Sequence, residues 1–316
     1  MIITVASGKG GTGKTIIATS LALCLENGIF IDADVEEPNA YIFLKPEIKE
    51  VKPVFLNVPL FNAKKCTYCG KCADFCQFKA LAVIPKQVIF FAGLCHGCGG
   101  CRLVCDKGAI EEEKRHIGEV QTGQINQLLD LDVLPPDTPF ARHKDFFTGP
   151  RLIFRQGKLS LGEALAVPVV RAVKEDLTPK NSHPVVIIDA PPGTSCPVVE
   201  AINGSDYCLL VTEPTPFGLS DLKLAREIVK ELKIPAGVVV NRVMAEDGLA
   251  EIKMYCQEEN IPILATFPFD RQIAYAYSKG IPLIYAYPEG KEKMQNILKQ
   301  IKKESTLRQN FLTTDV

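Results

Sequence analysis

The chain has 316 residues, a mass of 34.7 kDa, 47% hydrophobic residues and a formal net charge of −1. This charge provides no global basic field for nucleic acid, so nucleic acid is not an expected partner, and no apolar run reaches the roughly 18 residues that a membrane span requires. Met1 leads directly into an apolar run rather than a signal peptide, and we expect a cytoplasmic protein.

A glycine-rich loop follows the apolar run at residues 2–6 and precedes a helical segment at residues 15–25. It reads Gly8, Lys9, Gly10, Gly11, Thr12, Gly13, Lys14 and Thr15. A strand, such a loop and a helix in this order predict a nucleotide-binding loop, because backbone N–H groups and the helix dipole bind polyphosphate. We expect Lys14 to reach the outer phosphates of ATP or ADP and Thr15 to hold Mg²⁺.

Two acidic turns follow buried strands farther along the chain. The strand at residues 29–32 leads into a loop from Asp32 to Asn39, where a carboxylate can orient the attacking water. The strand at residues 185–188 leads to Asp189, which we expect to hold Mg²⁺ through water, and to Gly193, whose backbone is expected near the γ-phosphate.

Eight of the twelve cysteines fall between residues 66 and 105, after short extended pieces at residues 45–61 that three prolines interrupt. Two C-x2-C-x2-C-x3-C runs repeat at a shift of 29 residues (95 − 66), which also aligns Ala80 with Ala109 and Leu81 with Ile110. Disulfides are not expected in a reducing compartment. Zinc ribbons use fewer thiolates, at a different spacing along the sequence. The duplicated runs therefore predict iron–sulfur binding.

The spacing of each run matches that of bacterial ferredoxins with two [4Fe–4S] clusters, in which the fourth cysteine crosses to the other cluster. The predicted ligands are Cys66, Cys69, Cys72 and Cys105 for cluster one, and Cys95, Cys98, Cys101 and Cys76 for cluster two. The proline that usually follows the fourth cysteine is replaced by Gln77 and Asp106, which leaves the number of ligands intact.

The remainder of the chain alternates between strands and helices. A return strand is expected at residues 117–120, a surface loop, lid or insertion at 124–150, a strand at 153–159 and a helix at 162–175 with Pro168 near its start or at a kink. Further segments follow at residues 207–212, 219–232, 236–241, 249–259 and 263–267. Such alternation predicts a mostly parallel sheet covered on both faces, with Asn241 and Arg242 at its ligand-binding edge.

Near the C-terminus, residues 291–304 place Met294, Ile297, Leu298 and Ile301 on one helical face. Packing of this face against the sheet is favoured over contact with a membrane. Cys24, Cys208 and Cys256 lie in apolar patterns and are expected in the core.

Together these motifs resemble the deviant Walker A loop, switch I and switch II of MinD-superfamily ATPases that carry an inserted ferredoxin domain. The resemblance implies a doubly wound, mostly parallel α/β P-loop NTPase sheet with a small α+β ferredoxin-like domain inserted in it. The expected domains are a first ATPase part at residues 1–62, the ferredoxin-like domain at 63–115 and a second ATPase part at 116–316.

The resemblance also implies roles for single residues. Lys9 corresponds to the signature lysine that reaches a phosphate in the partner subunit of a homodimer, although in a monomer it would be only a solvated cation. Asp34 corresponds to the residue that positions water, and Asn241 to an asparagine that reads the adenine edge, with loop capping as its alternative. For Cys196, seven residues after Asp189, a structural or switch-linked thiol is favoured over an interfacial metal ligand.

The functional prediction is an ATPase whose dimer cycle is coupled to electron transfer through two [4Fe–4S] clusters, with an unidentified redox or metallocluster protein as partner. The alternatives are a metallocluster carrier or assembly ATPase and a MinD-like positioning protein. Eight ligands spaced for stable clusters, and the lack of the C-terminal C-x-x-C of related scaffold ATPases, favour the first.

Overall fold

The computed structural model describes residues 1–125, 151–175, 185–244 and 246–313. Its strands are β1 (Ile2–Ala6), β2 (Asn27–Asp32), β3 (Glu47–Phe61), β4 (Leu81–Ile84), β5 (Gln87–Phe90), β6 (Ile110–Ile125), β7 (Arg151–Leu159), β8 (Val186–Asp189), β9 (Tyr207–Thr212), β10 (Ala236–Val243) and β11 (Ile263–Pro268). Its helices are α1 (Lys14–Ala22), α2 (Tyr41–Leu44), α3 (Lys71–Phe75), α4 (Gly100–Leu103), α5 (Val167–Lys174), α6 (Cys196–Ile202), α7 (Pro216–Glu231), α8 (Glu246–Glu258), α9 (Arg271–Ser278), α10 (Leu283–Ala286) and α11 (Gly290–Thr313), with a 3₁₀ turn η1 (Ala92–Leu94).

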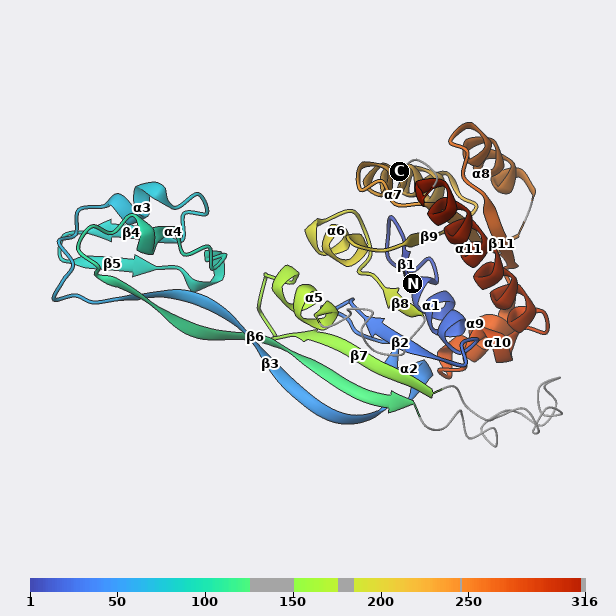
Figure 1. Ribbon diagram of the computed structural model, residues 1–316, viewed down its shortest axis with the longest axis horizontal. Coiled ribbons are helices and arrows are strands. Elements are labelled where there is room, and N and C mark those ends of the chain that lie inside the picture. The colour runs from blue at the N-terminus through green and yellow to red at the C-terminus, as the bar shows by residue number, and fades with distance from the viewer. Residues whose placement is uncertain (126–150, 176–184, 245, 314–316) are drawn as a thin grey trace.

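The body is a nine-stranded sheet in the order β11-β10-β9-β1-β8-β2-β7-β6-β3 (Figure 1). Seven strands, from β11 to β7, pair in parallel, and most of them are short apolar runs, as expected for strands covered on both faces. The last two strands, β6 and β3, are antiparallel. The predicted mostly parallel α/β sheet is confirmed.

Two apolar cores cover the two faces of this sheet. One lies against α5, α6, α7 and α8, and the other against α1, α2, α10 and α11. The four apolar side chains predicted on the C-terminal helix are at most 5% exposed and belong to the second core. The predicted packing of this helix against the sheet is therefore confirmed.

Strands β3 and β6 form a long antiparallel ribbon that leaves the body (Figure 1). The prediction of short extended pieces at residues 45–61 was wrong, because this stretch is the single strand β3. Pro53 and Pro59 are compatible with it because β3 lies at the edge of the sheet, where one side of the strand needs no donor. The expected return strand at residues 117–120 is likewise part of the longer β6.

The ribbon carries a small lobe at its far end, residues 62–109, which we call the tip lobe (Figure 1). It contains the β4–β5 hairpin, α3, η1 and α4. Few of its apolar side chains are buried: Ala80, Leu81 and Ala109 are, together with Ile110 where β6 begins. A unit of this size with so small a core needs a further source of stability.

Two other expectations concern the middle and end of the chain. The predicted helix at residues 162–175 begins only at Val167, with Pro168 in its first turn, where proline fits best. Most of the predicted lid, residues 126–150, lies outside the described residues, while 124 and 125 end β6. Within the described ranges, the helices lack the combination of length and apolar character needed to cross a membrane.

Candidate functional site

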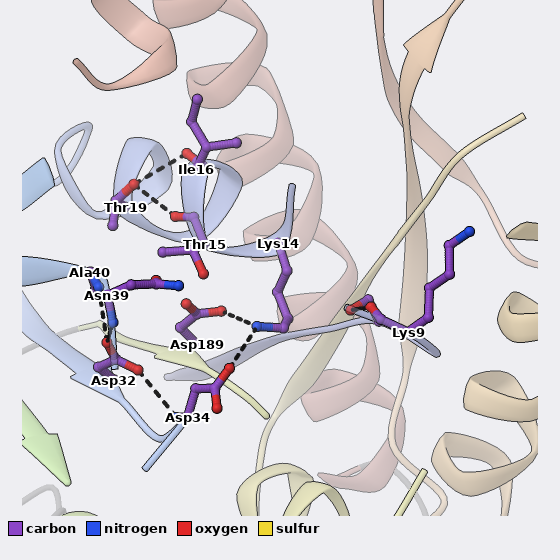
Figure 2. A network of polar contacts seen from close by, with 11 residues as sticks. Lys9, Lys14, Thr15, Ile16, Thr19, Asp32, Asp34, Asn39, Ala40 and Asp189 are labelled. Atoms are coloured by element: carbon purple, nitrogen blue, oxygen red, sulfur yellow. Dashed lines mark hydrogen bonds and ion pairs between the residues drawn. The ribbon is translucent and has the colours of Figure 1, made fainter. Parts of the chain in front are cut away.

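The glycine-rich loop lies between β1 and α1 and borders a pocket of about 390 Å³ (Figure 2). Gly11 and Gly13 have φ values of 83° and 90°, which favour glycine. A Cβ on Gly8 would lie 2.1 Å from the Asp221 carbonyl oxygen, so this position also needs glycine. The loop therefore presents its backbone at the C-terminal edge of the sheet, where parallel α/β folds bind ligands.

Lys14 points into this pocket and faces two carboxylates (Figure 2). Its Nζ lies 3.1 Å from Asp189 Oδ1 and 4.0 Å from Asp34 Oδ2. Burial lowers the pKa of Lys14, but the negative charges of Asp189 and Asp34 outweigh burial and raise it above its ordinary value. The structure thus brings together the predicted phosphate-binding lysine, the predicted water-positioning carboxylate and the predicted magnesium carboxylate.

Several buried polar atoms in or next to the lining of this pocket lack a hydrogen-bond partner within the described part of the chain. They are Asp189 Oδ2, Asn39 Oδ1 and Thr12 Oγ1. Buried polar atoms normally have a partner, and a fully buried carboxylate oxygen is a suitable ligand for a hard cation. Asp189 and the neighbouring Thr15 hydroxyl therefore fit a Mg²⁺ site chemically.

Asp32 organises the start of the acidic loop (Figure 2). Its Oδ1 accepts a hydrogen bond from Asp34 N at 3.1 Å, and its Oδ2 accepts from Asn39 N and Ala40 N, both at 3.0 Å. Burial and the charge of Asp189 raise the pKa of Asp32 to about 8. Burial also raises the pKa of Asp34, to about 6, although Lys14 opposes it.

Lys9 projects away from Lys14 and is 35% exposed (Figure 2). Its Nζ lies 3.7 Å from Glu213 Oε2, while Arg242 Nη1 lies 2.6 Å from Glu213 Oε1. Sequence reasoning gave Glu213 no role, because the strand end that carries it is more than 200 residues away from Lys9. Only the adjacency of β1 and β9 brings the two side chains together.

Asn241 and Arg242, for which we predict nucleotide contacts, line the same pocket. Asn241 Nδ2 donates a hydrogen bond to Thr12 O at 2.8 Å and would block any Cβ on Gly13, so this residue also supports the loop. Phe269, Ile273 and Tyr277 form an apolar part of the lining that sequence reasoning missed. Gly193 donates from its N–H to Ser7 O at 3.0 Å.

The eight clustered cysteines line two further pockets, both in the tip lobe. One, of about 150 Å³, is lined by Cys66, Cys69, Cys72 and Cys105. The other is lined by Cys76, Cys95, Cys98 and Cys101. In each pocket, the first three cysteines of one run lie with the fourth cysteine of the other run. These are the two sets of four that the spacing predicts.

Backbone N–H groups point at thiols in a repeated pattern. Ala80 N donates to Cys76 Sγ at 3.3 Å, and the equivalent Ala109 N donates to Cys105 Sγ at 3.4 Å. In the described ranges, no three His, Cys, Asp or Glu side chains converge closely enough for a single metal ion. Thiolate donors with N–H partners around two hollows fit a larger thiolate-bound group.

The other cysteines lie in the body. Cys208 and Cys256 are buried, as expected, whereas Cys24 is only half-buried. Cys196 is exposed and begins α6, which follows the predicted switch II turn. It remains a candidate switch-linked thiol.

This fold and its nucleotide-type pocket define the class of the protein. The sequence model of the CobQ/CobB/MinD/ParA nucleotide binding domain family matches residues 3–283. The chain belongs to this family. Its architecture is similar to MinD of Pyrococcus horikoshii in complex with Mg-ADP, with a TM-score of 0.54, 16% identity and 97% of each chain covered. MinD of Pyrococcus furiosus is similar too, with a TM-score of 0.52, 18% identity and coverage of 96% of this chain and 98% of that one.

Individual relatives are more similar in sequence. The uncharacterized protein MJ0579 of Methanocaldococcus jannaschii is 32% identical over 284 residues, which cover 89% of this chain and 90% of the relative. A Pyrococcus horikoshii protein named iron-sulfur cluster carrier protein is 24% identical over 331 residues, which cover 95% of this chain and 87% of the relative.

Proposed function

We propose that the protein hydrolyses ATP and couples this reaction to electron transfer through two [4Fe–4S] clusters in the tip lobe. In the nucleotide site, the loop from Gly8 to Thr15 cradles the phosphates, and Lys14 moves from its carboxylate partners to the outer phosphates. Thr15 and Asp189 hold Mg²⁺, and Asp34 orients the attacking water. Family membership and the arrangement of these side chains around one pocket support these roles.

A homodimer across the nucleotide completes the proposed site. The Lys9 side chain pairs with Glu213 and points away from the nucleotide pocket of its own subunit. Because it is partly exposed, it can instead reach the nucleotide of a second subunit. We expect Lys9→Ala to lower the ATPase rate about 10³-fold, which is the scale of a cation supplied to transferring phosphate in trans.

The test is to measure the rate of phosphate release from ATP by the Lys9→Ala protein and the parent protein. The Lys253→Ala protein is the control. Lys253 is an exposed lysine on α8, far along the chain from the loop. Full activity of the Lys9→Ala protein would contradict the role in trans.

The two cysteine pockets are the proposed cluster sites. Cluster one is assigned to Cys66, Cys69, Cys72 and Cys105, and cluster two to Cys95, Cys98, Cys101 and Cys76. When bound, such clusters supply one-electron redox chemistry. They would also stabilise a ferredoxin-like lobe that has few buried apolar side chains of its own.

The proposed coupling of ATP hydrolysis to the clusters rests on a continuous set of contacts between the acidic loop and the tip lobe. Leu159 N donates to Val35 O at 2.8 Å, and a Cβ on Gly157 would lie 2.5 Å from Val35 Cγ1, so the loop rests on β7. β7 pairs with β6, and β6 runs directly into the lobe. At the lobe, a Cβ on Gly97 would lie 2.6 Å from Leu56 of β3.

The test is the ATPase rate of anaerobically purified protein, with the clusters first reduced by dithionite and then oxidised, at matched iron content. We expect different rates in the two states, since a change in the lobe would act on the acidic loop through β6 and β7. Equal rates would mean that the lobe is not coupled to hydrolysis.

A cluster carrier is the second candidate function, since the relatives named iron-sulfur cluster carrier protein align with most of this chain. It predicts that nucleotide changes the release of iron–sulfur clusters to an apo-ferredoxin acceptor. Gated redox chemistry instead predicts clusters that stay bound through many ATP turnovers. Iron retained by the chain after such turnovers separates the two.

A further inference from the structure

The two cysteine pockets differ in their distance from the ATPase body. The pocket of Cys76, Cys95, Cys98 and Cys101 is also lined by Asn57, Val58 and Glu112 of the ribbon, so it faces the body. Among the described residues, the lining of the pocket of Cys66, Cys69, Cys72 and Cys105 includes none from β3 and only Ile110, the first residue, from β6. β3 ends and β6 starts at the far end of the ribbon (Figure 1). The pocket that borders only the start of β6 is therefore the distal one.

Positive charge collects around the distal pocket. Lys71 and Lys107 line it, and Lys64 and Lys65 directly precede Cys66; all four are exposed. We call these four the lysine rim. Asp106 pairs with Lys71 and also lies within electrostatic range of Lys107, but Lys64 and Lys65 have no ion-pair partner in the part of the chain described.

Charges of both signs lie on the side of the lobe that faces the ribbon. Glu111, Glu112 and Glu113 are consecutive and exposed at the start of β6. Glu112 pairs with Arg102 at 3.2 Å, which leaves two of the three without a recorded partner among the described side chains. Lys114 and Arg115 directly follow these glutamates, so the charges on this side balance. The lysine rim, with four lysines against Asp74 and Asp106, keeps an excess of positive charge that would steer an acidic partner to the distal end.

We propose that the lysine rim is the docking surface for a small, acidic, one-electron donor protein, which delivers its electron at the distal pocket. This proposal rests on the proposed function, because it takes the distal cysteines as the ligands of cluster one. Leu103, 85% exposed and two residues before the distal Cys105, is an apolar side chain available to the same partner. A basic rim with a small apolar centre suits a transient complex whose association is steered by charge.

The transfer is balanced without any further reactant. The donor gives up one electron and is oxidised by one equivalent, and the centre held by Cys66, Cys69, Cys72 and Cys105 is reduced by one equivalent. No bond is made or broken, and no proton has to move.

Flavodoxin hydroquinone, an acidic one-electron donor, is the probe. Stopped-flow bleaching of the iron–sulfur absorbance of the full chain gives the second-order rate constant at 50 and 300 mM NaCl. We expect salt to lower this constant about tenfold, and the variant K64E/K65E/K107E to lower it at least about tenfold at 50 mM NaCl. Lys253→Glu, which makes the same kind of charge change on the body, should have no such effect.

A second readout does not depend on redox activity. Carbodiimide joins lysine to carboxylate in contacting proteins, so cross-links between oxidised flavodoxin and Lys64, Lys65 or Lys107 are expected. Reduction by dithionite should be equal in the variant and the parent protein, which shows that the clusters and the lobe are intact.

The outcomes separate this proposal from the proposed function. With iron retained and normal reduction by dithionite, a flavodoxin rate indifferent to salt and to K64E/K65E/K107E would overturn the docking surface alone. Rim-dependent binding to vesicles containing phosphatidylserine, without cross-linking to flavodoxin, would also overturn it. Cross-links at the rim of a chain that binds no iron would overturn the redox function while supporting the docking surface.

Discussion

At the scale of single residues, the buried Lys14 is surrounded by more negative charge than it can neutralise. Asp32, Asp34 and Asp189 all contribute to its raised pKa, and Asp189 is completely buried. Several acids around one cation are costly in a low-dielectric environment, and the carboxyls of Asp32 and Asp34 accordingly have raised pKa values and hold their protons more tightly. A site of this kind is prepared for a bound divalent cation, which would restore the balance of charge.

The raised pKa of Asp34 gives a prediction about the stability of the nucleotide-free protein. Its carboxyl titrates near 4 when unfolded and at about 6 when folded, mainly because of burial. The stabilisation from this proton is therefore complete below pH 4 and is lost as pH rises through 6. Relative to the parent, Asp34→Asn should gain up to about 1.4 kcal/mol of unfolding free energy per pH unit between pH 4 and 6.

Urea unfolding at half-unit steps of pH tests this expectation, with Asp221→Asn as the control at an aspartate near the loop. The difference between Asp34→Asn and the parent should become constant above about pH 7. A difference that is constant across the whole range would show that Asp34 titrates normally in the folded protein.

Some of these residues could be predicted from sequence and others could not. Lys14, Asp34 and Asp189 each adjoin a strand end in a known order, and such ends meet at one edge of a parallel sheet. Glu213 also follows a strand end, that of β9, but its partner Lys9 could not be predicted from this position. Tyr277 on α9 carries no comparable local signal. Their positions at the pocket depend on which strands become neighbours and on where α9 packs.

At the scale of elements, the ribbon and the tip lobe show how local patterns mislead. Prolines at positions 53 and 59 suggested interrupted pieces, but an edge strand tolerates them, and edge position is a property of the whole sheet. The cysteine repeat was more informative. Its spacing predicted two sets of four, and the structure gathers both sets in separate pockets.

Gly97 provides a prediction at this scale. It has φ of 66°, and a Cβ there would lie 2.6 Å from Leu56 Cδ1 and 3.0 Å from Asn57 O. Gly97→Ala should displace the loop that carries Cys95 and Cys98 while leaving the first pocket in place. We expect iron content to fall from about eight to about four atoms per chain.

Gly93→Ala is the matched control, because nothing lies within 4 Å of its added Cβ and it also precedes the second cysteine run. Iron analysis of both variants, with circular dichroism to confirm folding, measures the effect. Equal iron content in the two variants would show that cluster two does not depend on this close contact with the ribbon.

At the scale of the whole molecule, the question is how a lobe at the end of a ribbon can respond to nucleotide. The sheet supplies the connection, since β2, β7 and β6 are successive neighbours and the acidic loop extends from the end of β2. The base of the lobe is also fastened to the body. Arg115 on β6 donates from Nη1 to Glu163 Oε2, and Glu163 is only 5% exposed.

Breaking this fastening should uncouple the lobe from hydrolysis without removing either activity. In Glu163→Gln, the amide oxygen can still accept from the N–H groups of Ala164 and Leu165, but an NH₂ group can now face Arg115 in place of an acceptor. The partly buried guanidinium loses its partner, so the start of β6 should move independently of β7. We expect normal iron content and normal ATPase activity with oxidised clusters, together with at least a twofold loss of the difference between the reduced and oxidised rates. Glu200→Gln is the control, because it removes a comparable ion pair with Arg171, between α5 and α6. This variant should keep the full difference between the reduced and oxidised ATPase rates. Equal behaviour of the two variants would place the coupling elsewhere in the molecule.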